Sequence, residues 1–156
     1  MVRKAQIKDV NRVHELIDYY AKQDMMLPRA ESEISENIRD FFVYEKGKAL
    51  SGCAALHIFS DKLSEIRSLA VCPDHIKEGI GTGLVKACIK EAEGLGIKGV
   101  FVLTQKSDFF NKFGFVLTEK KKLPQKIWND CSICSKFAKC DEIAYIKAPP
   151  ERDREL

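Results

Sequence analysis

A glycine-containing turn near the middle of the sequence has the residue types of a phosphate-binding loop. An apolar run ends at Val71-Cys72-Pro73, and the turn Gly79-Ile80-Gly81-Thr82-Gly83 leads into an amphipathic stretch. Glycines let the backbone approach a ligand closely, and the N–H groups and positive dipole at a helix start attract anions. The turn therefore favours a diphosphate, whereas glycines that only tighten a turn would give the same local pattern.

Three cysteines form the second group with chemical potential. Cys131, Cys134 and Cys140 follow the spacing C-x2-C-x5-C, with Asp141 beside the last. Zinc is usually held by four ligands in paired Cys or His clusters, and no second C-x2-C is present, so zinc is not favoured. A reduced structural cluster and a redox-sensitive pair remain equal alternatives. The other three cysteines are interpreted as small core residues: Cys53, Cys72 and Cys88.

The elements that must position these groups follow from hydrophobic periodicity. Strands are predicted at 2–5, 41–45, 50–59, 65–71, 100–103, 115–118 and 142–146, with the second to fourth forming an antiparallel meander. Helices are predicted after an N-cap at Asp9, with Val10, Val13, Ile17 and Tyr20 on one face, at 31–40, after the glycine turn, and at 108–112. The chain is thus an α/β protein with a strand–helix–strand unit around the glycine turn.

Composition and charge limit the number of domains and the kinds of binding partner that can be expected. The 156 residues, 45% hydrophobic and with net charge +3, predict a single domain over 1–147 and a flexible tail over 148–156. A basic segment at 118–141 contains the three cysteines, and within 118–139 six lysines against two acidic residues give +4. That charge is modest for nucleic-acid binding, and no nucleic-acid motif accompanies it. Without a long apolar run or a signal-like start, we expect no membrane partner and a cytoplasmic protein.

The combined pattern resembles the GNAT superfamily of acyl-CoA N-acyltransferases. The resemblance rests on Leu69-Ala70-Val71-x-Pro73, the glycine turn six to eight residues past that proline, and Phe109-Phe110-x-Lys112-x-Gly114-Phe115. It implies a mixed, mostly antiparallel sheet splayed at its central strands, with flanking helices and acetyl-CoA as co-substrate between those strands. The implied cofactor-binding residues are Leu69, Ala70, Val71, Lys77, Glu78, Gly79, Ile80, Gly81, Thr82 and Phe110.

Two positions depart from the superfamily pattern. Ile76 stands where an Arg or Gln is usual, so the pyrophosphate must depend more on backbone amides and on Lys77. Phe110 stands where many relatives carry a tyrosine that protonates the leaving thiolate, and phenylalanine cannot be that acid.

Further stretches resemble one branch, the amino-acid N-acetyltransferases of the N-acetylglutamate synthase type. They include Leu27-Pro28-Arg29, 52–56, 65–71, 102–104 and Leu123-Pro124. The branch implies direct transfer of acetyl from acetyl-CoA to the α-amino group of L-glutamate, the first step of arginine biosynthesis. Its long form also carries an amino-acid-kinase-like domain, for which 156 residues leave no room. The protein could also form a homodimer, which the sequence does not decide.

The branch also implies roles for individual residues. Glu65 is the general base, and Thr104 is the hydroxyl near the leaving thiolate. The expected substrate-binding residues are Arg29, Arg67, Ser68 and Lys126, with Arg67 alternatively paired to Glu65 and Lys139 as an alternative to Lys126. Other acceptors remain: glutamine, aspartate, a small amine or a peptide N-terminus. The alternative to an enzyme is a binding module that uses the cysteine segment for interaction.

Overall fold

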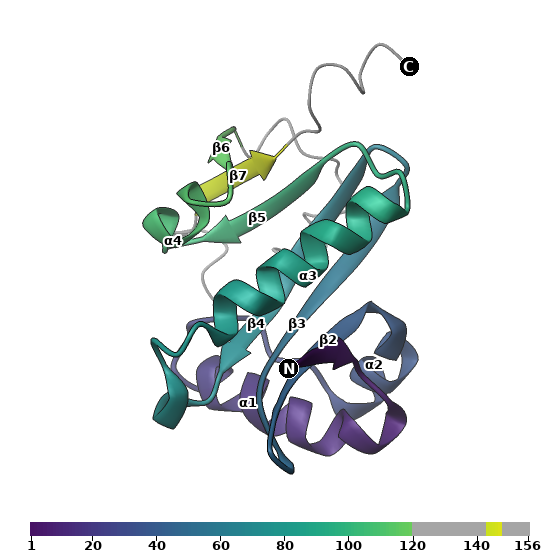
Figure 1. Cartoon of the computed structure of the whole chain (residues 1–156), viewed down its shortest axis with the longest axis vertical. Coiled ribbons are helices and arrows are strands. Elements are labelled where there is room, and N and C mark those ends of the chain that lie inside the picture. The colour runs from purple at the N-terminus through teal and green to yellow at the C-terminus, as the bar shows by residue number, and fades with distance from the viewer. Residues whose placement is uncertain (120–142, 148–156) are drawn as a thin grey trace. The chain divides into compact units, whose positions relative to one another are not determined.

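The computed structural model describes residues 1–119 and 143–147 and contains a sheet with strand order β1-β2-β3-β4-β5-β7-β6 in that part of the chain (Figure 1). The strands are β1 (Val2–Lys4), β2 (Phe41–Lys46), β3 (Ala49–Ser60), β4 (Leu63–Val71), β5 (Val100–Thr104), β6 (Val116–Leu117) and β7 (Ile143–Lys147). Pairing is antiparallel for β1 with β2, β2 with β3, β5 with β7, and β6 with β7. Only a two-residue turn joins β3 to β4, which requires an antiparallel hairpin.

The exception is the parallel pair β4–β5, which the helix α3 (Ile80–Gly94) connects as a crossover. The recorded register between the two strands joins Ser64 to Val100 and Glu65 to Phe101. The mixed sheet and the strand–helix–strand unit predicted around the glycine turn are therefore confirmed.

The chain divides into two compact units, of which the first comprises Met1–His57 and Ile66–Glu91. Its core contains one face of α1 (Val10–Ala21), Ile34 of α2 (Glu31–Glu36), and inward residues of β2 and β3. Gly52 of β3 lies against Ile80 and Leu84 of α3, which runs along the strands (Figure 1). This unit contains the glycine turn and the two arginines predicted to bind substrate.

The second unit comprises Ile58–Glu65 and the described residues from Ala92 onward. Leu63, Phe101 and Ala144 form its buried centre, and Phe59 stacks on Phe101 with ring centroids 6.0 Å apart. The short helix α4 (Ser107–Asn111) carries Phe110 into a group of edge-to-face aromatic contacts. No helix in the described residues is long and apolar enough to cross a membrane.

Three sequence predictions need correction at element ends. Asp9 does not cap α1 with its side chain, because its carboxylate instead accepts hydrogen bonds from Arg3 and from the backbone N–H of Gln6. The helix predicted at 31–40 is split, since α2 ends at Glu36 and a 3-10 turn, Ile38–Asp40, follows after Asn37. The last strand, predicted to end at Ile146, extends one residue further, because Lys147 is the last residue of β7 and pairs with Val100.

Candidate functional site

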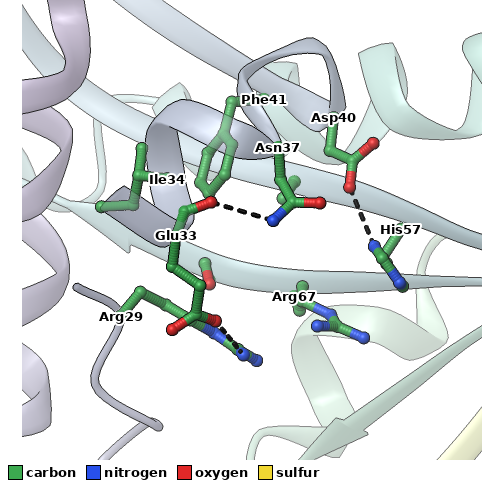
Figure 2. A pocket seen from close by; sticks show the side chains of 10 residues that line it. Arg29, Glu33, Ile34, Asn37, Asp40, Phe41, His57 and Arg67 are labelled. Carbon is green, nitrogen blue, oxygen red and sulfur yellow. Dashed lines mark hydrogen bonds and ion pairs between the residues drawn. The ribbon is translucent and has the colours of Figure 1, made fainter. Parts of the chain in front are cut away.

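A polar pocket lies in the first unit, between the segment around α2 and the strands β2, β3 and β4 (Figure 2). Its lining residues are Arg29, Glu33, Ile34, Asn37, Asp40, Phe41, Ala55, His57, Arg67 and Ser68. Two of the four predicted substrate-binding residues, Arg29 and Arg67, are 38 positions apart in sequence and yet line the same pocket, and Ser68 joins them.

Arg29 is held in place before α2 begins. Pro28 precedes it and α2 starts two residues later, so the chain turns into the helix directly after the arginine. Its Nη1 donates to Oε2 of Glu33 at 2.9 Å, and its side chain is only 11% exposed. An arginine has five N–H donors on a rigid fork, a geometry that suits it to bind carboxylates.

Arg67 and Ser68 reach the pocket from consecutive positions of β4, which simple strand alternation would place on opposite faces. Ser68 has a φ of +56°, in the left-handed region that residues other than glycine rarely adopt. The strand is therefore irregular at this position, and strained backbone of this kind concentrates at functional sites. The sequence contains no signal for this irregularity.

A histidine–carboxylate pair that the sequence analysis missed completes the pocket. Nδ1 of His57, on β3, lies 2.9 Å from Oδ2 of Asp40, the last residue before β2 (Figure 2). Figure 2 also shows Arg67 labelled between this pair and the Arg29–Glu33 pair. His57 and Asp40 are 17 positions apart in sequence, and nothing in the local sequence around either residue indicates that they pair.

The two predicted catalytic residues lie on the central strands. Glu65 is on β4, is 8% exposed, and precedes Arg67 by two residues. Thr104 ends β5, and its Oγ1 accepts a hydrogen bond from the backbone N–H of Lys106 at 2.9 Å. With that lone pair engaged, the hydroxyl proton of Thr104 is available for donation to another group.

The glycine turn leads into a helix, as its sequence predicted. Lys77 and Gly79 have φ values of +71° and +82°, and α3 begins at Ile80. Nothing lies within 4 Å of where a Cβ of Gly79 would be, so the turn needs this glycine for its dihedral angle rather than for space. The amide of Gly83 bonds to the carbonyl of Gly79, and the preceding amides point out of the helix end, as in any α-helix.

Charges around the turn are already balanced. The carboxylate of Glu78 pairs with Nζ of Lys46 and with Nδ1 of His75, the latter at 2.9 Å. Hydrogen bonds from Lys46 and then from His75 lower the pKa of Glu78, so this carboxylate stays ionised. Its negative charge is therefore partly neutralised beside a helix start that would hold a phosphate.

The end of β4 and the residue Phe110 are the remaining predicted cofactor contacts. Ala70 is buried, Leu69 and Val71 are half-buried, and the carbonyl of Val71 accepts a hydrogen bond from the hydroxyl of Tyr20. Tyr20 was expected only as an apolar core residue. Phe110 is buried against Phe109 and Phe115 (neighbouring ring centroids at 5.0 and 5.5 Å).

The predictions for Lys126, Cys131, Cys134 and Cys140, and for the alternative Lys139, lie outside the described residues. Within 1–119 and 143–147, no group of three or more His, Cys, Asp or Glu side chains could hold a metal ion.

A family model for the acetyltransferase (GNAT) family matches residues 8–115, more than half of the chain. The chain belongs to the acetyltransferase (GNAT) family. The protein is therefore an acetyl-CoA-dependent acetyltransferase of the GNAT kind.

Curated relatives extend the GNAT similarity over nearly the whole chain. An uncharacterized N-acetyltransferase of Chlorobaculum tepidum is 42% identical over 146 residues, which cover 94% of each chain. An amino-acid acetyltransferase of Mycobacterium tuberculosis is 31% identical over 94% of this chain and 87% of its own length. The amino-acid acetyltransferase of Pasteurella multocida is 32% identical over 80% of this chain, which there spans only 29% of the relative's length.

Solved structures of GNAT proteins agree with the fold. Rv2747 of Mycobacterium tuberculosis, in complex with CoA and NLQ, matches with a TM-score of 0.81, 26% identity, and coverage of 96% of this chain and 99% of the other. N-acetylglutamate synthase of Neisseria gonorrhoeae, complexed with coenzyme A and N-acetyl-glutamate, matches with a TM-score of 0.85 and 27% identity. That match covers 95% of this chain and 34% of the synthase. The predicted fold class is confirmed.

Proposed function

We propose that this GNAT protein transfers the acetyl group of acetyl-CoA to the α-amino group of L-glutamate, giving N-acetylglutamate and CoA. The observation that carries the proposal is the pocket in which Arg29 and Arg67 come together from distant parts of the sequence. Arginine is suited to carboxylates because its planar fork can donate two parallel hydrogen bonds. An acceptor amine without a carboxylate would have no use for this pair.

The amine must be deprotonated before it can attack the thioester carbonyl. Glu65 is the proposed proton acceptor, acting directly or through a water molecule. It shares β4 with Arg67 at a spacing of two, and this spacing puts the two side chains on the same face of a strand. The position of Glu65 two residues before Arg67 on β4 is the support for this assignment.

The reaction balances without a covalent intermediate on the protein. Glu65 accepts the first ammonium proton, the nitrogen lone pair forms the new C–N bond, and the C–S bond breaks. The nitrogen then loses a second proton to become the amide, and the departing CoA thiolate takes up one proton, so the net product besides the amide and CoA is one proton released to water. Thr104 is the proposed partner of that thiolate, because its Oγ1 accepts the hydrogen bond from Lys106 and the hydroxyl keeps its own proton to donate. Its alkoxide is too basic for it to be the final proton source, so water must replace the proton.

The pyrophosphate of acetyl-CoA is proposed to bind at the amides of Gly79–Thr82, with the pantetheine along Leu69–Val71. Glycine at position 79 gives the required positive φ, and α3 is 15 residues long, enough for a full dipole at its start. Lys46, already beside Glu78, places one further cation near this turn.

The test is a free-thiol release assay with acetyl-CoA and each amino acid, on wild type and on Arg29→Ala. We expect the KM for glutamate to rise by roughly 30- to 150-fold, which corresponds to about 2–3 kcal/mol for a charged hydrogen-bonded pair, while the KM for acetyl-CoA is unchanged. Arg39→Ala is the matched control, because Arg39 is exposed and outside the pocket. An unchanged KM for glutamate in Arg29→Ala would overturn the assignment.

The single variant has one complication that the structure identifies. Removing Arg29 leaves the carboxylate of Glu33 in the pocket without this ion pair, and its charge alone could repel glutamate. The double variant Arg29→Ala/Glu33→Ala removes both charges. If Arg29 binds the substrate, the double variant stays weak for glutamate; if repulsion by Glu33 is the whole effect, affinity returns and the role of Arg29 is refuted.

A further inference from the structure

A hydrogen bond between α1 and the end of β4 has no role in the reaction above. The hydroxyl of Tyr20, near the end of α1, donates to the carbonyl of Val71, the last residue of β4, across 51 positions of sequence. Burial, and then the neighbouring Tyr19 and Cys72, raises the pKa of Tyr20. The hydroxyl therefore keeps its proton at neutral pH and remains a donor.

The carbonyl of Val71 belongs to the peptide unit through which the chain leaves β4. The N–H of this same unit, which is the amide of Cys72, donates to the carbonyl of Ser51 on β3 at 2.7 Å. Both polar atoms of the unit are thus held, one by α1 and the other by β3. Hydrogen bonds in a chain polarise one another, so the bond from Tyr20 also strengthens the bond to Ser51.

Tyr20 also ends α1 through its main chain. Its carbonyl accepts a hydrogen bond from the amide of Met25 at 3.1 Å, and Asp24 has a φ of +57°. The amide of Asp24 bonds to the carbonyl of Ala21 at 3.0 Å, which completes a Schellman motif. The chain then continues to Arg29, which lines the polar pocket. One residue therefore fixes the helix end before Arg29 with its backbone and the end of β4 with its side chain.

We propose that Tyr20 is a positioning residue of the acetyl-CoA site, and that its hydroxyl fixes the peptide at the end of β4 beside which the pantetheine lies. The inference rests on the proposed function, because it uses the proposed course of the pantetheine along Leu69–Val71. Without this hydroxyl the peptide keeps only its bond to Ser51 and can tilt about it. The end of β4, and the loop that follows from Pro73, then lose the orientation that the cofactor requires.

The experiment compares Tyr20→Phe with wild type. Phenylalanine keeps the ring and the main-chain bonds that end α1, and removes only the donor to Val71. We expect the Kd for CoA, measured by calorimetry without an acceptor, and the KM for acetyl-CoA to rise roughly two- to tenfold, the effect of one neutral hydrogen bond. The KM for glutamate at saturating acetyl-CoA should stay unchanged, because Arg29 keeps its pair with Glu33.

Tyr19→Phe is the matched control. It removes the same atom from the next residue, which is 48% exposed and whose ring meets that of Tyr20 edge to face. Its Kd for CoA and both KM values should equal those of wild type.

A second measurement needs no substitution at position 20. The four tyrosines are replaced by 3-fluorotyrosine, and their fluorine NMR signals are assigned by changing the other three tyrosines to phenylalanine one at a time. The signal of Tyr20 should shift when CoA is added, whereas glutamate alone should leave it in place.

Each outcome decides the question. An unchanged Kd for CoA in Tyr20→Phe, with or without a lower Tm, would assign the hydrogen bond to stability alone and overturn the positioning role. An equal rise of both KM values, or a Tyr20 signal that CoA does not shift, would overturn it as well. Those results leave acetyl transfer to glutamate intact. Absence of thiol release with every amino acid, in wild type that binds CoA, would instead refute the proposed function.

Discussion

Gly52→Ala tests whether the sheet sets the position of the proposed cofactor-binding helix. Gly52 lies on β3, facing the first turns of α3. A Cβ at this position would be 2.8 Å from Cγ2 of Ile80, 3.0 Å from Cδ1 of Leu84 and 3.3 Å from the carbonyl oxygen of Ala70. Carbon atoms at ordinary contact are about 3.5–4.0 Å apart, so the added methyl would lie about 0.7–1.2 Å too close to Cγ2 of Ile80. Ile80 and Leu84 are fully buried, and neither can rotate into solvent.

The overlap must be relieved by moving α3 away from β3. Overpacking of this kind costs about 1–3 kcal/mol, and in a domain of this size each kcal/mol lowers Tm by about 2–4 °C. Because Ile80 is the first residue of α3, the shift falls on the turn proposed to hold the pyrophosphate, so we also expect the KM for acetyl-CoA to rise.

Thermal unfolding followed by circular dichroism gives the stability, and thiol release gives the KM. Gly94→Ala is the matched control in the last turn of the same helix, where nothing lies within 4 Å of the added Cβ. Alanine favours helix over glycine by up to about 1 kcal/mol, so this variant should be as stable as wild type or more stable. If Gly52→Ala unfolds at the temperature of wild type with an unchanged KM for acetyl-CoA, the close packing of β3 on α3 is refuted.

Three further predictions concern single side chains. Asp9→Asn should destabilise the protein by about 1–3 kcal/mol at pH 7, because the Asp9 carboxylate accepts two hydrogen bonds from Arg3 at 2.8 and 3.1 Å. Those bonds hold the pKa of Asp9 below its ordinary value, so in chemical denaturation the gap between wild type and variant should close as pH falls below about 4. Complete burial raises the pKa of the Cys53 thiol to about 12, so peptide mapping after alkylation at pH 8 should find half-buried Cys72 modified while Cys53 is intact. Glu65→Gln should lower kcat and abolish the acidic limb of the pH–rate profile, and an unaltered limb would assign the base elsewhere.

Much of the fold was predictable because its signals are local. The glycine turn, the amphipathic helix after it and the short apolar strand predicted at 100–103 each occupy few residues, and their order implies a parallel crossover. The predictions that were wrong concern the ends of helices and strands, where a contact with a residue elsewhere in the fold competes with a local hydrogen bond. Asp9 has the sequence of an N-cap, but the fork of Arg3 offers its carboxylate stronger, charge-assisted bonds.

Residues of the site were predictable only where the residue type or a local motif already indicated the role. Arg29 and Arg67 were expected from residue type and from resemblance, and the pocket unites them. The pair of His57 and Asp40 exists only after β3 has been placed beside the segment before β2, and no local periodicity contains that information. The left-handed conformation of Ser68 is likewise a property of the folded strand, since serine has no preference for it.

The pairing of pocket charges has a consequence for affinity. An arginine that faced the pocket alone would have a large desolvation cost in the empty protein, and Glu33 reduces that cost by holding Arg29 at 2.9 Å. The same contact occupies one part of the fork, so an incoming carboxylate must share the guanidinium with Glu33 rather than take all of it. Glu33→Gln would keep the size and one acceptor while removing the competing charge. If Arg29 binds glutamate as proposed, this variant should lower the KM for glutamate severalfold and leave that for acetyl-CoA unchanged, whereas a raised KM would mean that Glu33 is needed to orient the fork.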